Sequence, residues 1–330
     1  MTNQRPIRWG ILSTGNIAAK FAEGLSVVLD AELLAVGSRS AASAARFGEK
    51  WGIARRYDSY DALVADPDID IIYVATPHSG HMEETLRCLR AGKAVICEKP
   101  FAINTQQAQA MVDEARARKI FLMEAMWTRY LPAIVRVREL IAAGAIGDVR
   151  MLTADFGFRV EHPDPQNRLF NLELGGGGLL DVGVYPVSLA SMLFGTPTRI
   201  TGMADLGPTG IDEQAVMVLG DEQGHMALLA TSVRVSTPWE AQILGEGGRI
   251  HIPNPWWAAD EFTIHRNGQQ PERVYLPRTG NGYNYEAIEA MRCLRAGLTE
   301  SEIMPLDETL AIMTTMDTLR KQWGLKYPME

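Results

Sequence analysis

Two polar residues near the middle of the chain stand at a spacing that suits proton transfer. Asp181 and Tyr185 are four positions apart in a stretch that predicts a helix to about Phe194, so they lie one turn apart on one face. A lysine ammonium lowers the pKa of a neighbouring phenol, which can then give or take the proton of a substrate hydroxyl. Such a pair serves carbonyl–alcohol chemistry in which a nicotinamide carries the hydride. The alternative is structural: Asp181 caps the helix or forms a salt bridge, and Tyr185 is a packed aromatic residue.

Lys99 is the lysine that we pair with Tyr185. It follows a predicted strand, 94–97, and stands between Glu98 and Pro100. Pro100 restricts Lys99 to an extended backbone, and Glu98 gives the ammonium a possible partner. A lysine at the carboxyl end of a parallel strand stands where such sheets bind their ligands.

The start of the chain carries a second pattern with a chemical meaning. A short apolar run, 9–12, ends in small residues, and a helical pattern begins at Ile17. The spacing Ser13-x-Gly15-x-x-Ala18 fits the dinucleotide fingerprint, with serine in its first position. Unpaired N–H groups and the helix dipole at such a turn suit a pyrophosphate. A plain strand–turn–helix is the alternative.

The next predicted strand, 31–37, indicates which dinucleotide is bound. It is followed by Ser38 and Arg39 and by no carboxylate. An acidic residue here holds the ribose hydroxyls of NAD, whereas an arginine accommodates a 2′-phosphate. We therefore predict NADP(H) in preference to NAD. A solvated loop arginine is the alternative.

A buried strand, 68–77, brings more polar residues to the same edge of the sheet. His78 and His81 follow it, but no third metal ligand stands at a suitable spacing, so packing or hydrogen bonding is favoured over a metal site. We predict that the following residues bind the cofactor: Ser13, Thr14, Gly15, Asn16, Ile17, Ser38, Arg39, Thr76, Pro77, His78, His81, Glu98 and Lys99.

Length and composition set limits on the class of protein. The 330 residues allow two domains, and the net charge of -8 argues against nucleic acid or an anionic membrane as partner. Three widely spaced cysteines indicate reduced thiols in a cytoplasmic protein. We expect no membrane-spanning stretch, and residues 1–6 show no apolar leader.

The element pattern changes along the chain. Strands and helices alternate up to Glu124, which predicts an α/β, doubly wound parallel sheet of the Rossmann type. Alternating segments at 149–158, 199–205, 213–219, 225–235 and 240–252 then predict a large, mostly antiparallel open sheet in an α+β domain. We expect a dinucleotide-binding domain at 1–124 and a substrate and dimerisation domain at 125–330.

Several of these motifs occur together in one known family. The fingerprint 9–18, the triplet Glu98-Lys99-Pro100 and the stretch 175–185 stand in the order and spacing of the glucose–fructose oxidoreductase/inositol dehydrogenase (Gfo/Idh/MocA) family. The segments 123–130 and 322–328 resemble its dimeric dihydrodiol dehydrogenase branch, which includes NADP-dependent D-xylose dehydrogenases. That branch also has serine in the first fingerprint position and tyrosine at the acid/base position.

The resemblance implies roles for individual residues. Lys99, Asp181 and Tyr185 take the catalytic positions, and the open sheet faces the substrate and often a second subunit. The implied substrate-binding residues are Trp127, Arg129, Phe156, Phe158, Asp181 and Trp256, with Trp257 as a further candidate. Exposed aromatic rings suit the apolar faces of sugars and cyclic diols, whereas core packing is the alternative for each ring.

Our first hypothesis is an NADP-dependent dehydrogenase that acts on a sugar or a cyclic diol and forms a homodimer through the C-terminal sheet. One alternative is a binding protein of the same fold that senses NADP(H). Another is a ketosugar reductase of the 1,5-anhydrofructose type. A third keeps its cofactor and shuttles hydride between two sugars, which usually calls for a longer N-terminal arm than this sequence has.

Overall fold

The computed structural model describes residues 5–330, which form two compact units. The predicted absence of an apolar leader concerns residues that lie mostly outside the described range. The first unit comprises the described residues up to Ala102, Gln106–Trp127 and Thr279–Leu306. The second unit comprises Ile103–Thr105, Thr128–Arg278 and Asp307–Glu330.

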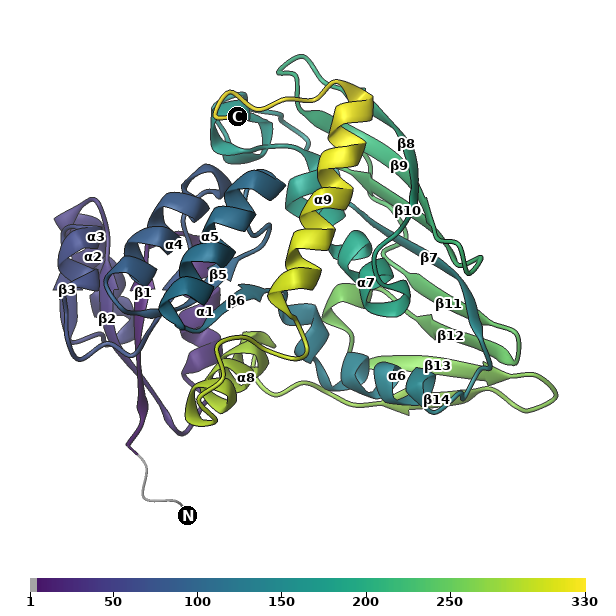
Figure 1. The fold of residues 1–330 in the computed structure, drawn as a ribbon, viewed down its shortest axis with the longest axis horizontal. Coiled ribbons are helices and arrows are strands. Elements are labelled where there is room, and N and C mark those ends of the chain that lie inside the picture. Colours follow the sequence, from purple (N-terminus) through teal and green to yellow (C-terminus); the bar gives the residue numbers. More distant parts are fainter. Residues whose placement is uncertain (1–4) are drawn as a thin grey trace. The chain divides into compact units, whose positions relative to one another are not determined.

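The first unit is built on a parallel sheet (Figure 1). In spatial order its strands are β3 (Arg55–Tyr57), β2 (Ala31–Gly37), β1 (Ile7–Leu12), β4 (Ile71–Val74), β5 (Ala94–Glu98) and β6 (Leu122–Ala125). Each neighbouring pair runs parallel. The order β3-β2-β1-β4-β5-β6 is that of a Rossmann sheet, which confirms the predicted fold of this part of the chain. The short strand β3 was not predicted.

Helices cover this sheet, and their ends follow local sequence signals. They are α1 (Asn16–Leu25), α2 (Ala41–Trp51), α3 (Tyr60–Val64), α4 (His81–Arg90), α5 (Thr105–Arg118) and α8 (Tyr283–Arg295). The hydroxyl of Ser40 accepts the N–H of Ser43 at 3.3 Å and caps the start of α2. Gly52 ends the same helix with φ at 66°, in the left-handed region that glycine adopts without strain.

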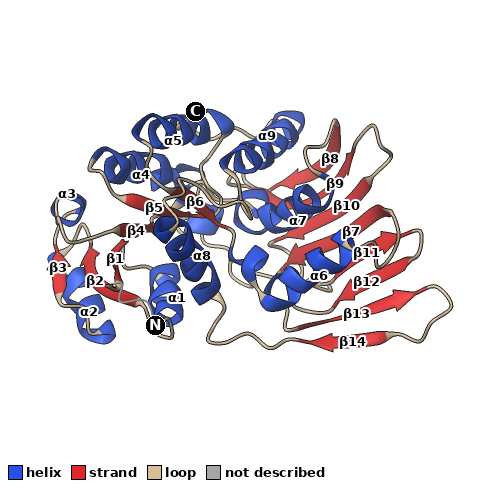
Figure 2. Cartoon of the chain, turned by 60° about the horizontal axis from the view of Figure 1, so that its bottom comes forward, coloured by secondary structure: helices blue, strands red, loops and turns tan. Residues whose placement is uncertain are grey.

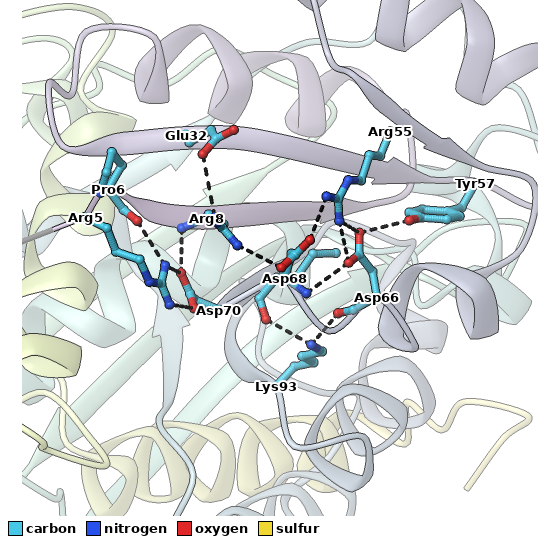
Figure 3. Close-up of polar contacts among 11 residues, drawn as sticks. Arg5, Pro6, Arg8, Glu32, Arg55, Tyr57, Asp66, Asp68, Asp70 and Lys93 are labelled. Carbon is cyan, nitrogen blue, oxygen red and sulfur yellow. Dashed lines mark hydrogen bonds and ion pairs between the residues drawn. The ribbon is translucent and has the colours of Figure 1, made fainter.

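Charged side chains fix the amino edge of the parallel sheet (Figure 3). Asp66 accepts two hydrogen bonds from the Arg55 guanidinium, at 2.7 and 2.8 Å. Lys93 donates to the carbonyl oxygens of Asp66 and Ile69. Burial acts to raise the pKa of the Asp66 carboxyl, but the bonds from Arg55 and from the N–H of Asp68 hold it below its usual value. The network ties the loop before β4 to its neighbours, and the opposite, carboxyl edge remains for ligand chemistry.

One segment departs from the predicted division into 1–124 and 125–330. Thr279–Leu306, which contains α8, belongs to the first unit, although the sequence analysis placed it in the second domain. Gly24 of α1 permits this packing, because a Cβ at Gly24 would lie 2.9 Å from Cβ of Tyr283. Beyond α8, the carbonyl of Thr299 accepts the N–H of Leu122 in β6 at 3.0 Å. Packing between segments so far apart in the chain cannot be predicted from the local sequence.

The second unit contains a larger sheet, seen from below in Figure 2. In spatial order its strands are β14 (Glu272–Tyr275), β13 (Glu261–Arg266), β12 (Gly248–Ile252), β11 (Ala241–Gly245), β7 (Val149–Gly157), β10 (Met226–Ser232), β9 (Asp212–Gly220) and β8 (Arg199–Leu206). Only β7 and β10 pair in parallel among these described strands. The mostly antiparallel sheet was predicted. Strands β13 and β14 were not, and the predicted segment 240–252 is the hairpin β11–β12.

The helices α6 (Pro132–Ala142), α7 (Val184–Phe194) and α9 (Leu306–Trp323) complete this unit. They lie on one face of the sheet, as Figures 1 and 2 both show. The stretch Leu172–Phe194, which contains α7, is long and apolar enough to cross a membrane by length and composition alone, contrary to our expectation. Most of it, 83% of the apolar window, is buried inside the protein, as in the core helix of a globular protein.

Candidate functional site

The turn between β1 and α1 has an unusual backbone. Ser13 adopts a φ of 95°, in the region that favours glycine, and its N–H donates to the carbonyl of Gly37 at 2.9 Å. Serine at this position of the fingerprint therefore makes the tight turn that glycine usually makes, at a cost in backbone strain. Strain of this kind clusters at ligand-binding sites.

Gly15 leaves open space at the start of α1. Its φ of -75° is accessible to any residue, yet a Cβ built on it meets no heavy atom within 4 Å. The helix has no side-chain cap at this end, whereas Ala18, one turn along, is fully buried. The first N–H groups of α1 thus face space into which an anion fits.

A groove of about 280 Å³ opens between the first turns of α1 and the side of α2. Its lining residues are Thr14, Gly15, Asn16, Ala19, Ser43, Arg46, Phe47, Lys50 and Trp51. The sequence analysis missed Ser43, Arg46 and Lys50, because their positions match those of any solvated helix face. Here Arg46 donates to the hydroxyl of Ser43 at 3.1 Å, and the Lys50 ammonium lies 5.1 Å from the ring centre of Trp51. Two cations beside an open helix start favour a phosphate group.

Ser38 and Arg39 differ in exposure at the end of β2. Ser38 is buried, and its hydroxyl accepts the N–H of Ser40 at 3.3 Å, whereas Arg39 is exposed. Tyr60 lies beside Arg39 and Ser13. Burial raises the pKa of the Tyr60 hydroxyl, and the Arg39 charge acts against that rise. Tyr60 was not predicted from the sequence.

His81 joins two turns at the carboxyl edge of the parallel sheet. The ring is fully buried, with Nδ1 at 2.8 Å from the Pro100 carbonyl oxygen and Nε2 at 3.0 Å from that of Thr76. The ring has no surface left for a cofactor, so we assign it a supporting role in place of the predicted direct contact. His78 is also buried and meets the His81 ring edge-on. Among residues 5–330 no group of three or more possible ligands could hold a metal ion.

Glu98 holds the backbone that carries Lys99. Its carboxylate accepts the Tyr73 hydroxyl on one oxygen and the N–H of Lys99, at 3.1 Å, on the other. Glu98 is 3% exposed, whereas Lys99 is half-buried. Burial and the nearby Glu98 raise the pKa of Glu286, in α8, well above its usual value. The Glu98 carboxylate thus holds the backbone of Lys99 in place. The side chain of Lys99, unlike that of Glu98, is partly exposed.

In the second unit, Asp181 and Tyr185 lie at the start of one buried helix. The helix begins with a π-helical turn, Leu179–Gly183, and continues as α7. Such turns are rare and occur often at functional sites. Asp181 accepts a bond from Arg168 at 2.7 Å, so the salt bridge that we held as an alternative is formed. Arg168 was not predicted, because its partner is set by the fold.

Aromatic rings gather around Tyr185. Phe156, from β7, lies 5.4 Å from the Tyr185 ring and stacks on Trp257 with ring centres 3.4 Å apart. Phe158 and Trp239 meet Phe156 edge-on. These rings, called here the aromatic cluster, are each partly buried except Tyr185, which is 7% exposed. Trp239 was not predicted to take part.

Two predicted substrate residues are buried and have internal hydrogen-bond partners. Arg129 is 2% exposed, and its guanidinium donates to the hydroxyl and carbonyl of Ser188 and to Glu308 at 2.6 Å. Trp256 is fully buried and donates its indole N–H to the Asp155 carbonyl at 2.8 Å. Buried polar groups require partners, and these two side chains hold helices and strands together. The substrate contacts of Arg129 and Trp256 therefore stay predictions.

The remaining predicted residues are divided between the two units. Lys99 and Trp127 lie in the first unit, and Asp181, Tyr185 and Phe156 lie in the second. Trp127 is stacked on Tyr283 of the same unit with ring centres 4.7 Å apart. The structure thus brings together Asp181, Tyr185 and Phe156, while the pairing of Lys99 with Tyr185 and the substrate role of Trp127 remain predictions.

A Rossmann sheet, followed by an open sheet whose buried helix carries Asp181 and Tyr185, defines a two-domain, nicotinamide-dependent class of oxidoreductase. The model of the oxidoreductase family with an NAD-binding Rossmann fold matches residues 7–126, and that of the GFO/IDH/MocA C-terminal domain matches residues 134–251. The chain therefore belongs to the GFO/IDH/MocA oxidoreductase family, as predicted.

Similar proteins support the predicted branch. The chain is 36% identical to trans-1,2-dihydrobenzene-1,2-diol dehydrogenase of Xenopus tropicalis, over 97% of this chain and 99% of that protein. It is 34% identical to the Homo sapiens protein of that name, over 98% and 99%. Among solved structures, KijD10, a 3-ketoreductase from Actinomadura kijaniata in complex with NADP and TDP-benzene, is 26% identical. The two structures match with a TM-score of 0.85 over 96% of this chain and 98% of that one.

The open space at Gly15 gives a direct test of the predicted dinucleotide site. We expect Gly15→Ala to change the free energy of unfolding by less than about 0.5 kcal/mol, because the added Cβ meets no atom. It should weaken NADPH binding at least about tenfold, since the methyl group occupies space that a pyrophosphate needs. Fluorescence titration of NADPH and thermal unfolding measure the two effects.

Gly52→Ala is the matched control. Gly52 has φ at 66° and open space around it, so this variant should lose about 1 kcal/mol of stability through backbone strain. It should bind NADPH as the wild type does. Unchanged NADPH affinity in Gly15→Ala would show that the dinucleotide does not approach this turn.

Proposed function

We propose that the protein is an NADP(H)-dependent oxidoreductase that transfers hydride between the nicotinamide and a CH–OH carbon of a cyclic diol or a sugar. The observation that carries this proposal is the aromatic cluster around Tyr185, with Asp181 one turn earlier on the same helix. Flat apolar rings beside a hydroxyl and a carboxylate match the faces and the hydroxyl groups of such substrates. The names of the dihydrodiol dehydrogenase relatives support this substrate class.

The first unit fits the dinucleotide. The open space at Gly15, the uncapped start of α1 and the cations Arg46 and Lys50 would hold its phosphates. The exposed Arg39 would meet a 2′-phosphate, which favours NADP(H), and KijD10 is in complex with NADP. When bound, the nicotinamide supplies the hydride acceptor or donor.

The protein's own residues supply the proton path. Tyr185 takes the substrate hydroxyl proton on Oη during oxidation and returns it during reduction. The ammonium of Lys99 favours the ionised form of the Tyr185 hydroxyl. Asp181, held by Arg168, accepts a second substrate hydroxyl and fixes its orientation. Partial burial of the aromatic cluster keeps water away from the reacting carbon.

A ketosugar reductase is the second candidate. The likeness to KijD10, a 3-ketoreductase, favours it. The same residues serve this reaction in reverse, with Tyr185 as the acid that protonates the carbonyl oxygen. The two candidates differ in substrate and direction and share the site.

We further propose that two copies associate through the uncovered face of the second sheet. Positions alternate between buried and exposed along β9 and β10, and between half-buried and exposed along β8. Several of the exposed positions carry large apolar side chains. Met203 opposes Val216, and Val218 opposes Leu228, in the register of these strands. Their exposed fractions are 41–76%, so they form one contiguous apolar face. A second copy covers such a face with the same residues by two-fold symmetry.

We place the protein in the cytoplasm, because Cys88, Cys97 and Cys293 are free and buried thiols. Proteins of reducing compartments retain such thiols.

Tyr185→Phe tests the proposed chemistry. The variant should bind NADPH with wild-type affinity and lose about 10²- to 10⁴-fold in kcat, because only the hydroxyl that moves the proton is removed. Turnover of a trans-dihydrodiol and of D-xylose, measured by NADPH absorbance, gives the result. Tyr285→Phe is the control, since its hydroxyl only accepts the N–H of Thr279. Wild-type turnover in Tyr185→Phe would reject the role of this residue.

The dimer proposal predicts the mass of a two-copy assembly at micromolar protein concentration, measured by sedimentation. Leu228→Glu should shift this mass towards the monomer, because the charge falls in the apolar face. Leu29→Glu, at a side chain that is 98% exposed in the first unit, should not. A monomeric mass for the wild type would contradict the proposal.

A further inference from the structure

The helix with Asp181 and Tyr185 begins without a cap of its own. Gly178 stands at its N-terminus and has no side chain that could cap the first turn. The N–H of Leu179 instead donates to Oδ2 of Asp212, the first residue of β9, at 2.6 Å. The first N–H groups of a helix have no partner within it, and a negative charge there is favoured by the helix dipole. Asp212 therefore supplies the missing cap from another strand.

The glycine-rich segment before this helix fits closely around the Asp212 carboxyl group. Gly177 has φ at 120°, and a Cβ on it would overlap Oδ1 of Asp212. A Cβ on Gly178 would lie 3.4 Å from Oδ2. The carbonyl of Gly176 accepts the Tyr327 hydroxyl at 2.7 Å, which fixes the other side of the segment. Any larger residue at Gly177 would displace the carboxylate from the start of the helix.

Asp212 has few polar partners for a buried acid. It is fully buried, and Oδ1 has no hydrogen-bond partner among residues 5–330. Burial raises the pKa of this carboxyl to about 7, although the N–H of Leu179 and the charge of Arg320 act to lower it. Its charge therefore changes within the pH range in which enzymes are assayed.

The charged and titratable groups that face Asp212 do not change their protonation state near neutral pH. Arg320, in α9, is paired with Asp317 and Glu330 at 2.5 and 2.6 Å. Burial, together with Asp212, raises the pKa of the Tyr327 hydroxyl well above its usual value. Asp212 is thus the group of this cluster whose charge changes near neutral pH.

We propose that Asp212 is a positioning residue of the reaction, whose carboxylate holds the first turn of the helix and thereby places Asp181 and Tyr185. The inference rests on the proposed roles of Asp181 and Tyr185. The ionised carboxylate makes a charge-assisted hydrogen bond, roughly twice as strong as a neutral one. Protonation weakens that bond, so the alignment of Tyr185 is lost as the pH falls through the pKa of Asp212.

The test compares the pH dependence of kcat for carbonyl reduction with NADPH in the wild type, Asp212→Asn and Asp212→Ala. In this direction Tyr185 donates its proton and therefore adds no loss of kcat at low pH. The wild type should lose kcat as the pH falls through about 7. Asparagine keeps an oxygen for the Leu179 N–H but does not titrate, so Asp212→Asn should retain kcat at pH 8 within a few-fold and lack this acidic limb. Asp212→Ala should lose kcat at every pH by at least about tenfold, with the KM for NADPH unchanged. Asp148→Asn, at an exposed site, is the matched control.

A second readout does not depend on activity. A buried acid with a raised pKa stabilises the folded state below its unfolded pKa, and this stability is lost as the pH rises through the folded pKa. The unfolding constant of the wild type should therefore rise up to about tenfold per pH unit between pH 5 and 7, relative to Asp212→Asn. This comparison still decides the charge of Asp212 if Asp212→Ala fails to fold.

Different results would contradict the role of Asp212 and the proposed function. An acidic limb that persists in Asp212→Asn, or equal pH slopes of stability in the two proteins, would overturn the role of Asp212. Wild-type protein that binds NADPH but turns over none of the substrates would instead overturn the proposed function.

Discussion

The helix that carries Asp181 and Tyr185 lies in the interior of the second unit, and this burial constrains everything around it. A buried helix can present polar side chains to a ligand only where its first turn meets a gap in the packing. The backbone N–H groups of that turn also need an acceptor, because no water reaches them. Asp212 is that acceptor, and the neighbouring glycines leave it room. The aromatic cluster then forms the wall beside Tyr185.

In the first unit, the start of helix α1 also has backbone N–H groups without a side-chain cap. At the start of α1 the N–H groups face open space, and no side chain of the unit caps them. An anion is the natural partner of such a helix end, and the cations along α2 reinforce that preference. Ser13, with its strained backbone, forms the tight turn between β1 and α1, and charged residues at the other edge of the sheet hold the strands in place.

The local sequence was sufficient to predict most helices and strands, but not the tertiary contacts that they make. The Rossmann strands, the fingerprint turn and the antiparallel character of the second sheet follow from periodicity and turn residues, and they are confirmed. Strands β13 and β14 were missed, and α8 was placed in the wrong unit, because packing over long sequence distances decides them. The internal partners of Arg129 and Trp256, which are both buried, could not be predicted either, because the fold sets them.

The central claim is that the protein carries out NADP-dependent oxidation of a CH–OH group. The most direct measurement is the formation of NADPH from NADP, with NAD in parallel, over D-xylose, D-glucose, other pentoses and a cyclic trans-dihydrodiol. Our account predicts turnover with at least one of these substrates and a higher kcat/KM with NADP than with NAD. Tight NADPH binding without turnover of any substrate, in either direction, would contradict it and favour a protein that senses the cofactor.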